Sequence, residues 1–148
     1  MKKLLLSACL SAAAIAAVAP AQARDTKMMM SIEKAMAAND AKNRLGDQVR
    51  FYFGDQKTPA IAERLGSGKT SQKTNSFGKS PETACNWVFL SAMLRLQEEA
   101  RAVGANAVVN IVSNYKNVEN ASATEFECHD GAMMTGVALK GDYVKLKQ

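Results

Sequence analysis

Histidine, tryptophan and cysteine are scarce in this chain, which has one histidine, one tryptophan and three cysteines among 148 residues. A structural zinc site needs four nitrogen or sulfur ligands, and a hydrolase triad needs a histidine beside an activated nucleophile. No G-x-S-x-G turn or comparable nucleophile motif accompanies the single histidine, His129. We therefore predict no catalytic residues, no enzyme activity and no cofactor.

Long apolar runs are absent after the first 23 residues, so we expect no membrane span in the rest of the chain. Apolar residues make up 47% of the whole sequence and charged residues 22%, which is typical of a globular protein. A chain of this length builds one hydrophobic core. We expect a single domain over residues 24–148, with a helical segment at 24–48 and the core at 49–148.

The N-terminal residues have the three parts of a secretory signal peptide. Two lysines at positions 2–3 precede an apolar run at Leu4–Val18, and small residues at Ala21 and Ala23 precede a cleavage site. The sequence therefore predicts a signal peptide at 1–23, a mature chain that begins directly after it, and a periplasmic location.

Cys9 offers a second interpretation of the N-terminus, because Leu6-Ser7-Ala8-Cys9 is similar to a lipobox, in which the cysteine is lipidated. Only three leucines precede this motif, fewer than the apolar region of a working signal peptide requires. The apolar run also continues past Cys9 to the alanine cleavage site. We therefore expect no lipid anchor.

The net charge is modest. Two of the 19 basic residues belong to the predicted signal peptide, so 17 basic residues face 14 acidic ones in the mature chain, a net charge of +3. So small and scattered a charge gives no argument for nucleic acid or an anionic membrane as partner. An unidentified envelope protein is the open candidate for a partner, and the sequence leaves the oligomeric state open.

Two cysteines, Cys85 and Cys128, remain after the predicted cleavage, an even pair in a compartment where disulfides persist. We predict that they are bonded. On the chain-entropy model, closing a loop of this length stabilises the fold by about 4 kcal/mol. The alternative, a redox-active or metal-binding thiol pair, lacks the CxxC spacing.

Two segments have helical periodicity. Ser31–Leu45 carries apolar residues at helical spacing, with Asn39-Asp40 placed to break it into two turns. Pro81–Val103 gives the stronger signal, because Ser80 can cap it, proline suits its first position, and Gly104 follows its end. Its apolar face places the first cysteine of the predicted pair inward.

Alternating or apolar runs predict the strands. They lie at Val49–Phe53, Ile61–Leu65, Ala107–Tyr115, Thr124–Asp130 and Ala132–Leu139, with Tyr143–Leu146 as an extension. We interpret 66–80 as an exposed polar loop. A long helix followed by strands with short connections predicts an α+β fold, with an antiparallel sheet of about four to five strands and one long helix packed on one face.

Gly66-Ser67-Gly68-Lys69-Thr70 has the ending of a P-loop, whose glycines let backbone amides cradle phosphates. The complete pattern requires another glycine five residues before Gly68, where this chain has Glu63. No buried strand precedes the motif, and the run after it lacks helical periodicity. We therefore interpret the segment as a flexible polar loop.

Soft metal ligands lie near the C-terminus, where Cys128-His129-Asp130 is close in sequence to Met133 and Met134. Thioethers suit Cu(I), and eight methionines is a high count for this length. Periplasmic copper or heavy-metal binding is therefore the alternative function, with His129, Met133 and Met134 as weak candidate ligands. We nevertheless predict that the chain has no metal site. A disulfide-bonded Cys128 is lost as a ligand, and an alternating strand directs one of the two methionines into the core. His129 fits a surface position at a strand end.

Lys73-Thr74-Asn75-Ser76-Phe77 places an aromatic residue among hydrogen-bonding residues in the predicted loop. Loops of this kind often carry binding residues. Lys73, Thr74, Asn75 and Phe77 are therefore weak candidates for a binding site, with the alternative that Phe77 fills the core.

The helix-to-strand junction Glu98–Asn110 and the closing segment Gly131–Lys140 resemble the YbjQ-like family of small α+β domains, which is often labelled as heavy-metal binding. The junction also resembles the periplasmic domain of the Rcs envelope-stress sensor lipoprotein, and the resemblance covers roughly Phe51–Leu146. Longer strings are similar to a group of small secreted proteobacterial proteins that are often named excinuclease ATPase subunit. These strings are FYFGDQ, KTNSFGKS, ACNWVFLSAM, GANAVVNIVS and EFECHDGAMMTGVALKGDYVKL.

The resemblances imply an α+β fold, an envelope location and a non-enzymatic binding or stress-related role. The stress sensor has two disulfides, whereas this chain has Ser113 where a second strand cysteine is expected, so its signalling role does not carry over. The ATPase name does not carry over either, because the chain lacks a complete P-loop. We expect an exported, non-enzymatic binding or envelope-stress-associated domain, with metal binding as the alternative and an excinuclease-type ATPase subunit as the least favoured function.

Overall fold

The computed structural model describes residues 24–147, so the predicted signal peptide, its cleavage residues Ala21 and Ala23, and Cys9 lie outside the described residues. The described elements, in chain order, are β1 (Asp25–Ser31), α1 (Ile32–Ala37), α2 (Ala41–Leu45), β2 (Arg50–Phe53), β3 (Ile61–Asn75), α3 (Pro81–Ala102), β4 (Ala107–Ser113), the 3-10 helix η1 (Tyr115–Asn117), β5 (Glu125–Gly131) and β6 (Met134–Leu146).

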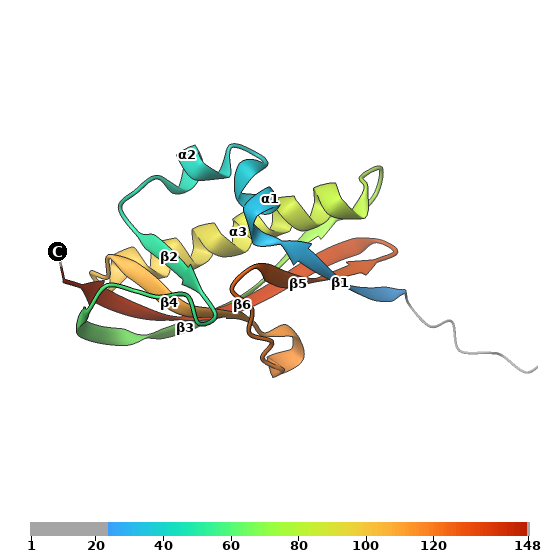
Figure 1. The fold of residues 1–148 in the computed structure, drawn as a ribbon. Coiled ribbons are helices and arrows are strands. Elements are labelled where there is room, and N and C mark those ends of the chain that lie inside the picture. Colours follow the sequence, from blue (N-terminus) through green and yellow to red (C-terminus); the bar gives the residue numbers. More distant parts are fainter. Residues whose placement is uncertain (1–23, 148) are drawn as a thin grey trace, which may run out of the picture.

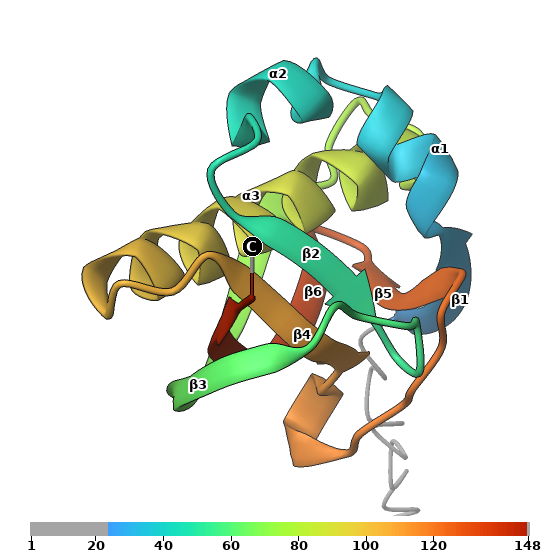
Figure 2. The ribbon, with the colours of Figure 1, turned by 60° about the vertical axis from the view of Figure 1, so that its left-hand side comes forward.

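Strand β6 organises the sheet. One of its edges pairs with β3 along its whole length, from Asn75 opposite Met134 to Ile61 opposite Leu146. Strands β5 and β4 divide the other edge, β5 near the start of β6 and β4 toward its end. Strand β1 extends the sheet beyond β5, and β2 extends it beyond β4, which gives the order β1-β5-β6-β4-β2 with β3 on the opposite edge of β6 (Figure 2).

The helices all lie on one side of the sheet. Helix α3 packs on β3 and β6, and α1 and α2 pack in turn on α3 (Figure 1). The segment that contains η1 lies against the opposite face, which we call the outer face. The architecture therefore agrees with an α+β layer arrangement in which one long helix covers one face of the sheet. None of the described helices combines the length and apolar character needed to cross a membrane.

The core lies between α3 and the sheet. Phe89 of α3 is fully buried and stacks on Phe126 of β5, with ring centroids 4.2 Å apart, and on Phe53 of β2 at 6.0 Å. Burial of an aromatic side chain of this size stabilises a fold by about 1.5–3 kcal/mol. One helical side chain thus joins strands from both ends of the sheet.

The signals that predict α3 are confirmed. The hydroxyl of Ser80 accepts a hydrogen bond from the backbone N–H of Thr83 at 3.1 Å, and Pro81 occupies the first turn. The helix ends at Ala102, one residue before the predicted end. The predicted break in the N-terminal helical segment is also confirmed, because α1 and α2 are separated by residues 38–40.

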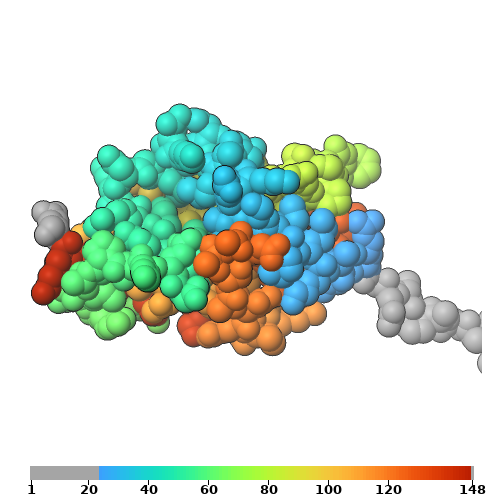
Figure 3. Space-filling view, viewed as in Figure 1, coloured from blue at the N-terminus to red at the C-terminus, as the bar shows by residue number. Residues whose placement is uncertain are grey.

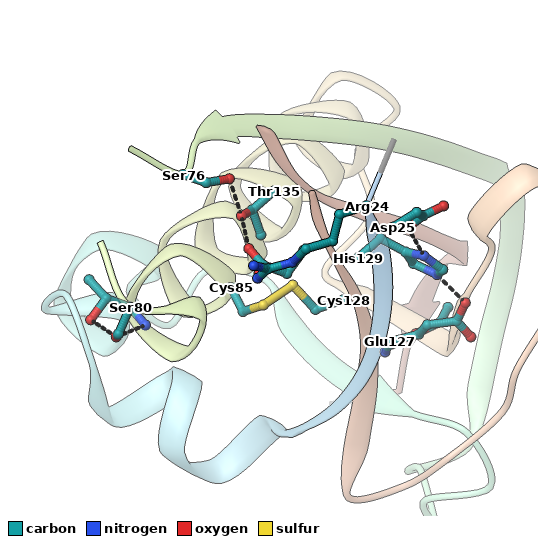
Figure 4. The surroundings of a disulfide bond; sticks show 12 residues. Arg24, Asp25, Ser76, Ser80, Cys85, Glu127, Cys128, His129 and Thr135 are labelled. Atoms are coloured by element: carbon teal, nitrogen blue, oxygen red, sulfur yellow. Dashed lines mark hydrogen bonds and ion pairs between the residues drawn. A yellow bond between two sulfur atoms is a disulfide. The ribbon is translucent and has the colours of Figure 1, made fainter. Parts of the chain in front are cut away.

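The predicted disulfide is present. Cys85 of α3 and Cys128 of β5 are joined by an S–S bond of 2.00 Å, and both are fully buried (Figure 4). The bond attaches the first turns of α3 to the sheet near β1.

The sheet is mixed, so the prediction of an antiparallel sheet is wrong in one pairing. Strand β2 runs parallel to β4, with Arg50 opposite Ala107. The prediction assumed that strands adjacent in sequence are adjacent in the sheet. Here β3 and α3 intervene between β2 and β4, and a connection of this length permits parallel pairing.

The prediction of a short strand followed by a loop at 66–80 is wrong, because β3 continues for 15 residues to Asn75. The polar composition of residues 66–75 is typical of a loop, so it did not indicate a strand. Only Thr70 of β3 is buried, and a strand with a free edge and little buried surface needs few apolar side chains. Its threonines are β-branched and suit extended backbone.

Two further differences concern the ends of the chain. Strand β1 was not predicted, since 24–48 was expected to be a helical segment with its helix at Ser31–Leu45. The strand pairs with β5 from Asp25 to Ser31. The two predicted strands at 132–146 are one continuous strand, β6. Gly141 lies in its middle because a Cβ there would meet the side chains of Val108 and Ile111 on β4.

Candidate functional site

A groove runs along the outer face of the sheet between β3 and η1. The floor leaves space for the groove because β6 presents the small residues Gly136 and Ala138, which pair with Lys73 and Ser71 of β3. The larger part of the groove has a volume of about 520 Å³. Its lining residues are Lys69, Thr70, Ser71, Lys73, Asn114, Tyr115, Lys116, Asn117 and Ala138.

The alternation of β3 places its lysines in this groove. Side chains two residues apart on a strand share a face, so Lys69, Ser71 and Lys73 form one row. Asn117, on the opposite wall, accepts a hydrogen bond from Nζ of Lys69 at 3.2 Å. Lys116 supplies a third ammonium, and none of the described residues that line this part of the groove is acidic. The groove therefore carries a local excess of positive charge.

A smaller hollow of about 210 Å³ continues the groove toward β1 and shares Lys73 and Tyr115 with it. Arg24, Asp25 and His129 line this part. The two hollows together form one surface, which we call the basic groove.

His129 of β5 is the centre of a polar cluster in the smaller hollow. Its Nδ1 lies 2.7 Å from Oδ1 of Asp25, and its Nε2 lies 2.6 Å from Oε1 of Glu127 (Figure 4). The ring stacks on that of Tyr115 with centroids 3.4 Å apart, and only 11% of the His129 side chain is exposed. The imidazole thus contacts two carboxylates at once, one on each ring nitrogen.

The cluster lowers the pKa of both carboxyl groups. The hydrogen bond to His129 is the largest cause of the lowered pKa of Asp25. Burial raises the pKa of Glu127, but hydrogen bonds to His129, Asn120 and Lys27 outweigh it, so its pKa is also lowered. Burial, followed by the hydrogen bond to Asp25, raises the pKa of Tyr115.

A second polar network fixes β1 to the sheet beneath the groove. Arg24 forms an ion pair with Asp130, whose Oδ1 accepts a hydrogen bond from the hydroxyl of Thr135 at 2.9 Å. That hydroxyl is 2.8 Å from the hydroxyl of Ser76, at the turn after β3 (Figure 4). Asp130 and Thr135 are buried, and buried polar groups need such partners.

The four predicted binding residues separate in the structure. Lys73 lies in the basic groove, whereas Thr74 follows it on the other face of β3. Asn75 accepts a hydrogen bond from the backbone N–H of Phe77 at 2.6 Å and so shapes the turn. The side chain of Phe77 is 88% exposed, so the alternative that it fills the core is wrong.

The three weak metal candidates do not converge. Both nitrogens of His129 face carboxylates on opposite sides of the ring, so the expectation of a surface position at a strand end is wrong. Met133 and Met134 are 77% and 48% exposed, so the expectation that one of them enters the core is also wrong. Within residues 24–147, no group of three or more histidine, cysteine or acidic side chains is arranged to hold a metal ion.

The segment that resembles the end of a P-loop lies inside β3, so its interpretation as a flexible loop is wrong. Gly68 pairs with Gly141, and a Cβ at Gly68 would collide with the hydroxyl of Tyr143, which donates a hydrogen bond to Glu99 at 2.6 Å. Close packing explains this glycine. Lys69 follows on the other face and enters the basic groove.

Lys69, Tyr115 and Lys116 line the basic groove, but the sequence does not indicate them as candidate binding residues. The lysines of β3 recur with a period of two, but this signal has meaning only once β3 is known to be a strand. The wall formed by η1 depends on a positive φ of 52° at Lys116, which nothing in the sequence indicated.

Comparison with protein-family models gives no match to this chain, and comparison with curated proteins gives none either.

Proposed function

We propose that the chain is an exported, non-enzymatic binding domain that holds an acidic ligand in the basic groove. The observation that carries this proposal is the convergence of Lys69, Lys73 and Lys116 around a concave surface whose larger part has no acidic lining residue. Lys116 pairs with Asp25 at 3.6 Å, whereas Lys69 and Lys73 form no ion pair within the described residues. Like charges brought together in this way raise the potential of a groove and attract anions.

The groove also offers neutral hydrogen-bonding groups. The hydroxyls of Ser71 and Tyr115 and the amide of Asn117 lie among the lysines. A ligand carboxylate can accept hydrogen bonds from the Ser71 hydroxyl and the Asn117 amide, whereas the Tyr115 hydroxyl already donates to Asp25 at 3.0 Å. Charge-assisted bonds are the stronger ones. An open groove along a strand suits an extended segment with several carboxylates, such as an acidic stretch of an envelope protein.

The environment of His129 supports a binding role over catalysis. Each ring nitrogen already faces a carboxylate oxygen, at 2.7 Å and 2.6 Å. A general base needs a nitrogen that can reach a substrate proton. Here the ring instead joins β1 to β5 and supports Tyr115 in the wall of the groove.

Export is the second part of the proposal, and the buried disulfide supports it, because disulfides persist in oxidising compartments. Mass analysis of the protein recovered from the periplasm tests this part. We expect an N-terminus at or near Arg24 and no lipid on Cys9. An intact N-terminus or a diacylated Cys9 would contradict it.

The binding part is tested by calorimetry with an oligoglutamate peptide and the double variant Lys69→Ala/Lys73→Ala. We expect salt-sensitive binding by the wild type and loss of about tenfold or more in affinity in the variant. Lys57→Ala is the matched control, because Lys57 is exposed but lies outside the groove. Equal binding by all three proteins would refute the groove as the site.

Affinity purification from the native periplasm identifies the natural ligand. The wild type and the groove variant are compared, and both bound proteins and bound metals are measured. A protein that is retained only by the wild type supports the proposal. Stoichiometric copper on both proteins would favour the alternative function, metal binding.

A further inference from the structure

An exposed apolar tip lies at the end of the molecule where β1 begins. It consists of Phe77, in the turn between β3 and α3, and of Met133 and Met134, in the turn between β5 and β6 and at the start of β6. Phe77 is 88% exposed, Met133 77% and Met134 48%. Figure 1 shows both turns at the same end, and Figure 3 shows the start of α3 projecting there.

The two turns are fixed to each other, so the tip is one surface. The backbone N–H of Ser76 donates a hydrogen bond to the carbonyl of Met133 at 3.0 Å, and Asn75 pairs with Met134. The turn that carries Phe77 is closed by the Asn75 side chain at 2.6 Å. The apolar side chains are therefore presented outward by ordered backbone and do not cover a core.

Cations surround the tip. Lys79 is exposed and donates a hydrogen bond from Nζ to the carbonyl of Asn75 at 2.8 Å, which holds its charge beside Phe77. Lys73 is also exposed, and it lies on β3 two residues before Asn75, the residue that pairs with Met134. The nearest buried carboxylate, Asp130, is paired with Arg24, and the exposed acidic residues on that side are Asp25 at the start of β1 and Glu82 in the first turn of α3.

We propose that this tip is a membrane-contact surface that inserts Phe77 and Met133 into the interface of a bilayer that contains anionic lipids. Protruding apolar side chains flanked by lysines match both layers of such an interface, because the side chains enter the acyl boundary while the ammonium groups remain at the phosphates. No local sequence pattern indicates this surface, because residues 77 and 133 are 56 positions apart in the chain.

The position of the N-terminus agrees with this orientation. Asp25 pairs with Gly131, directly before the turn that carries Met133, and the carbonyl of Arg24 lies beside Gly131. The preceding segment, whose residues Leu4–Val18 are apolar, therefore joins the domain at the tip. This inference does not rest on the proposed function, because Phe77 and Met133 lie outside the basic groove and the ligand is different, although Lys73 and Met134 also line the groove.

Vesicle cosedimentation tests the proposal. The purified wild type and Phe77→Ser/Met133→Ser are mixed with vesicles of phosphatidylethanolamine that contain phosphatidylglycerol, and with vesicles of phosphatidylcholine alone. We expect the wild type to bind to the anionic vesicles, and we expect the partition coefficient of the double variant to be lower by about tenfold or more. The N-terminal sequence is identical in both proteins, so its own contribution to binding cancels.

Two controls separate the tip from general surface properties. Val118→Ser removes an apolar side chain that is 69% exposed but lies after η1, and it should leave partitioning unchanged. Lys79→Glu should weaken binding to anionic vesicles, whereas Lys57→Glu should do so much less. The proposal would be overturned if the wild type and the tip variant partition equally, or if the wild type does not partition to vesicles. It would also be overturned if the tip captures a protein in place of lipid.

Discussion

The two faces of the sheet differ in nearly every physical property. The face toward α3 is packed with apolar side chains and joined to the helix by a disulfide, and Phe89 of α3, which packs on it, is fully buried. The outer face carries lysines, small residues and hydroxyl groups around an open groove. Its own apolar cluster, with Val109 and Val144, is small and lies at the end near β2. This division indicates that stability and binding depend on different residues, so that substitutions on each face should have separate effects.

The largest expected effect on stability comes from the disulfide on the α3 face. Cys128→Ser should lower the free energy of unfolding by about 2–5 kcal/mol, because the unfolded chain regains the freedom that the closed loop removes. Urea unfolding with and without reductant measures it. Reductant should destabilise the wild type and leave the variant unchanged, and an equally stable variant would contradict the account.

The buried network between the faces should have the next largest effect. Thr135→Val removes the hydroxyl that donates to Asp130 and contacts Ser76, so we expect a loss of about 1–3 kcal/mol in the free energy of unfolding. Thr26→Val, at an exposed position of β1, is the matched control and should have almost no effect. If Thr135→Val and Thr26→Val lower the free energy of unfolding by similar amounts, the network does not make a specific contribution to stability.

Acid should weaken the outer face through the His129 cluster. The pKa values of Asp25 and Glu127 are lowered from 3.8 and 4.5, so their contribution to stability is present above those values and is lost as the pH falls through the lowered ones. The charged and polar groups that face the ring or its partners are Asp25, Glu127, Lys27, Lys116, Tyr115 and Asn120.

His129→Gln tests this dependence, because it removes the imidazole whose two nitrogens hydrogen-bond with Asp25 and Glu127 and so lower both pKa values. The decrease in unfolding free energy between neutral pH and about pH 3 should be smaller in the variant than in the wild type. Urea titrations at several pH values measure the difference. Identical pH profiles would refute a role for the cluster.

The smallest effect on stability is expected in the groove itself. Lys69 is exposed and makes one hydrogen bond, to Asn117, so Lys69→Ala should change the free energy of unfolding by less than about 0.5 kcal/mol. Thermal unfolding measures this. A large loss would mean that the groove is part of the structural framework, and the contrast between the two faces would fail.

The α3 face was the more predictable half of the molecule. The period of the apolar residues, Ser80 before Pro81, and the even cysteine pair indicated α3 and its disulfide, since these are local signals or follow from the compartment. The outer face was not predictable in the same way. Its lysines lie on β3, whose polar edge sequence resembles a loop, and its far wall is η1, whose place is set by long-range packing.

The pairing of strands was the other limit. Strand β1 carries three consecutive methionines at 28–30 without alternation, and it is a strand because β5 offers a complementary edge. The parallel partnership of β2 and β4 likewise depends on the path of α3 across the sheet. Tertiary contacts therefore determine both pairings, β1 with β5 and β2 with β4. Of the four predicted binding residues, Lys73 is the one that the resulting sheet places in the groove.

The most direct test of the binding face is a map of backbone amide chemical shifts during titration with the oligoglutamate peptide. Our account predicts shift changes concentrated at Lys69–Lys73 of β3, at Tyr115–Asn117 of η1 and at Gly136–Ala138 of β6, all weakened by salt. Changes confined to α1, α2 and α3, or spread evenly over exposed lysines such as Lys57, would contradict the assignment of binding to the outer face.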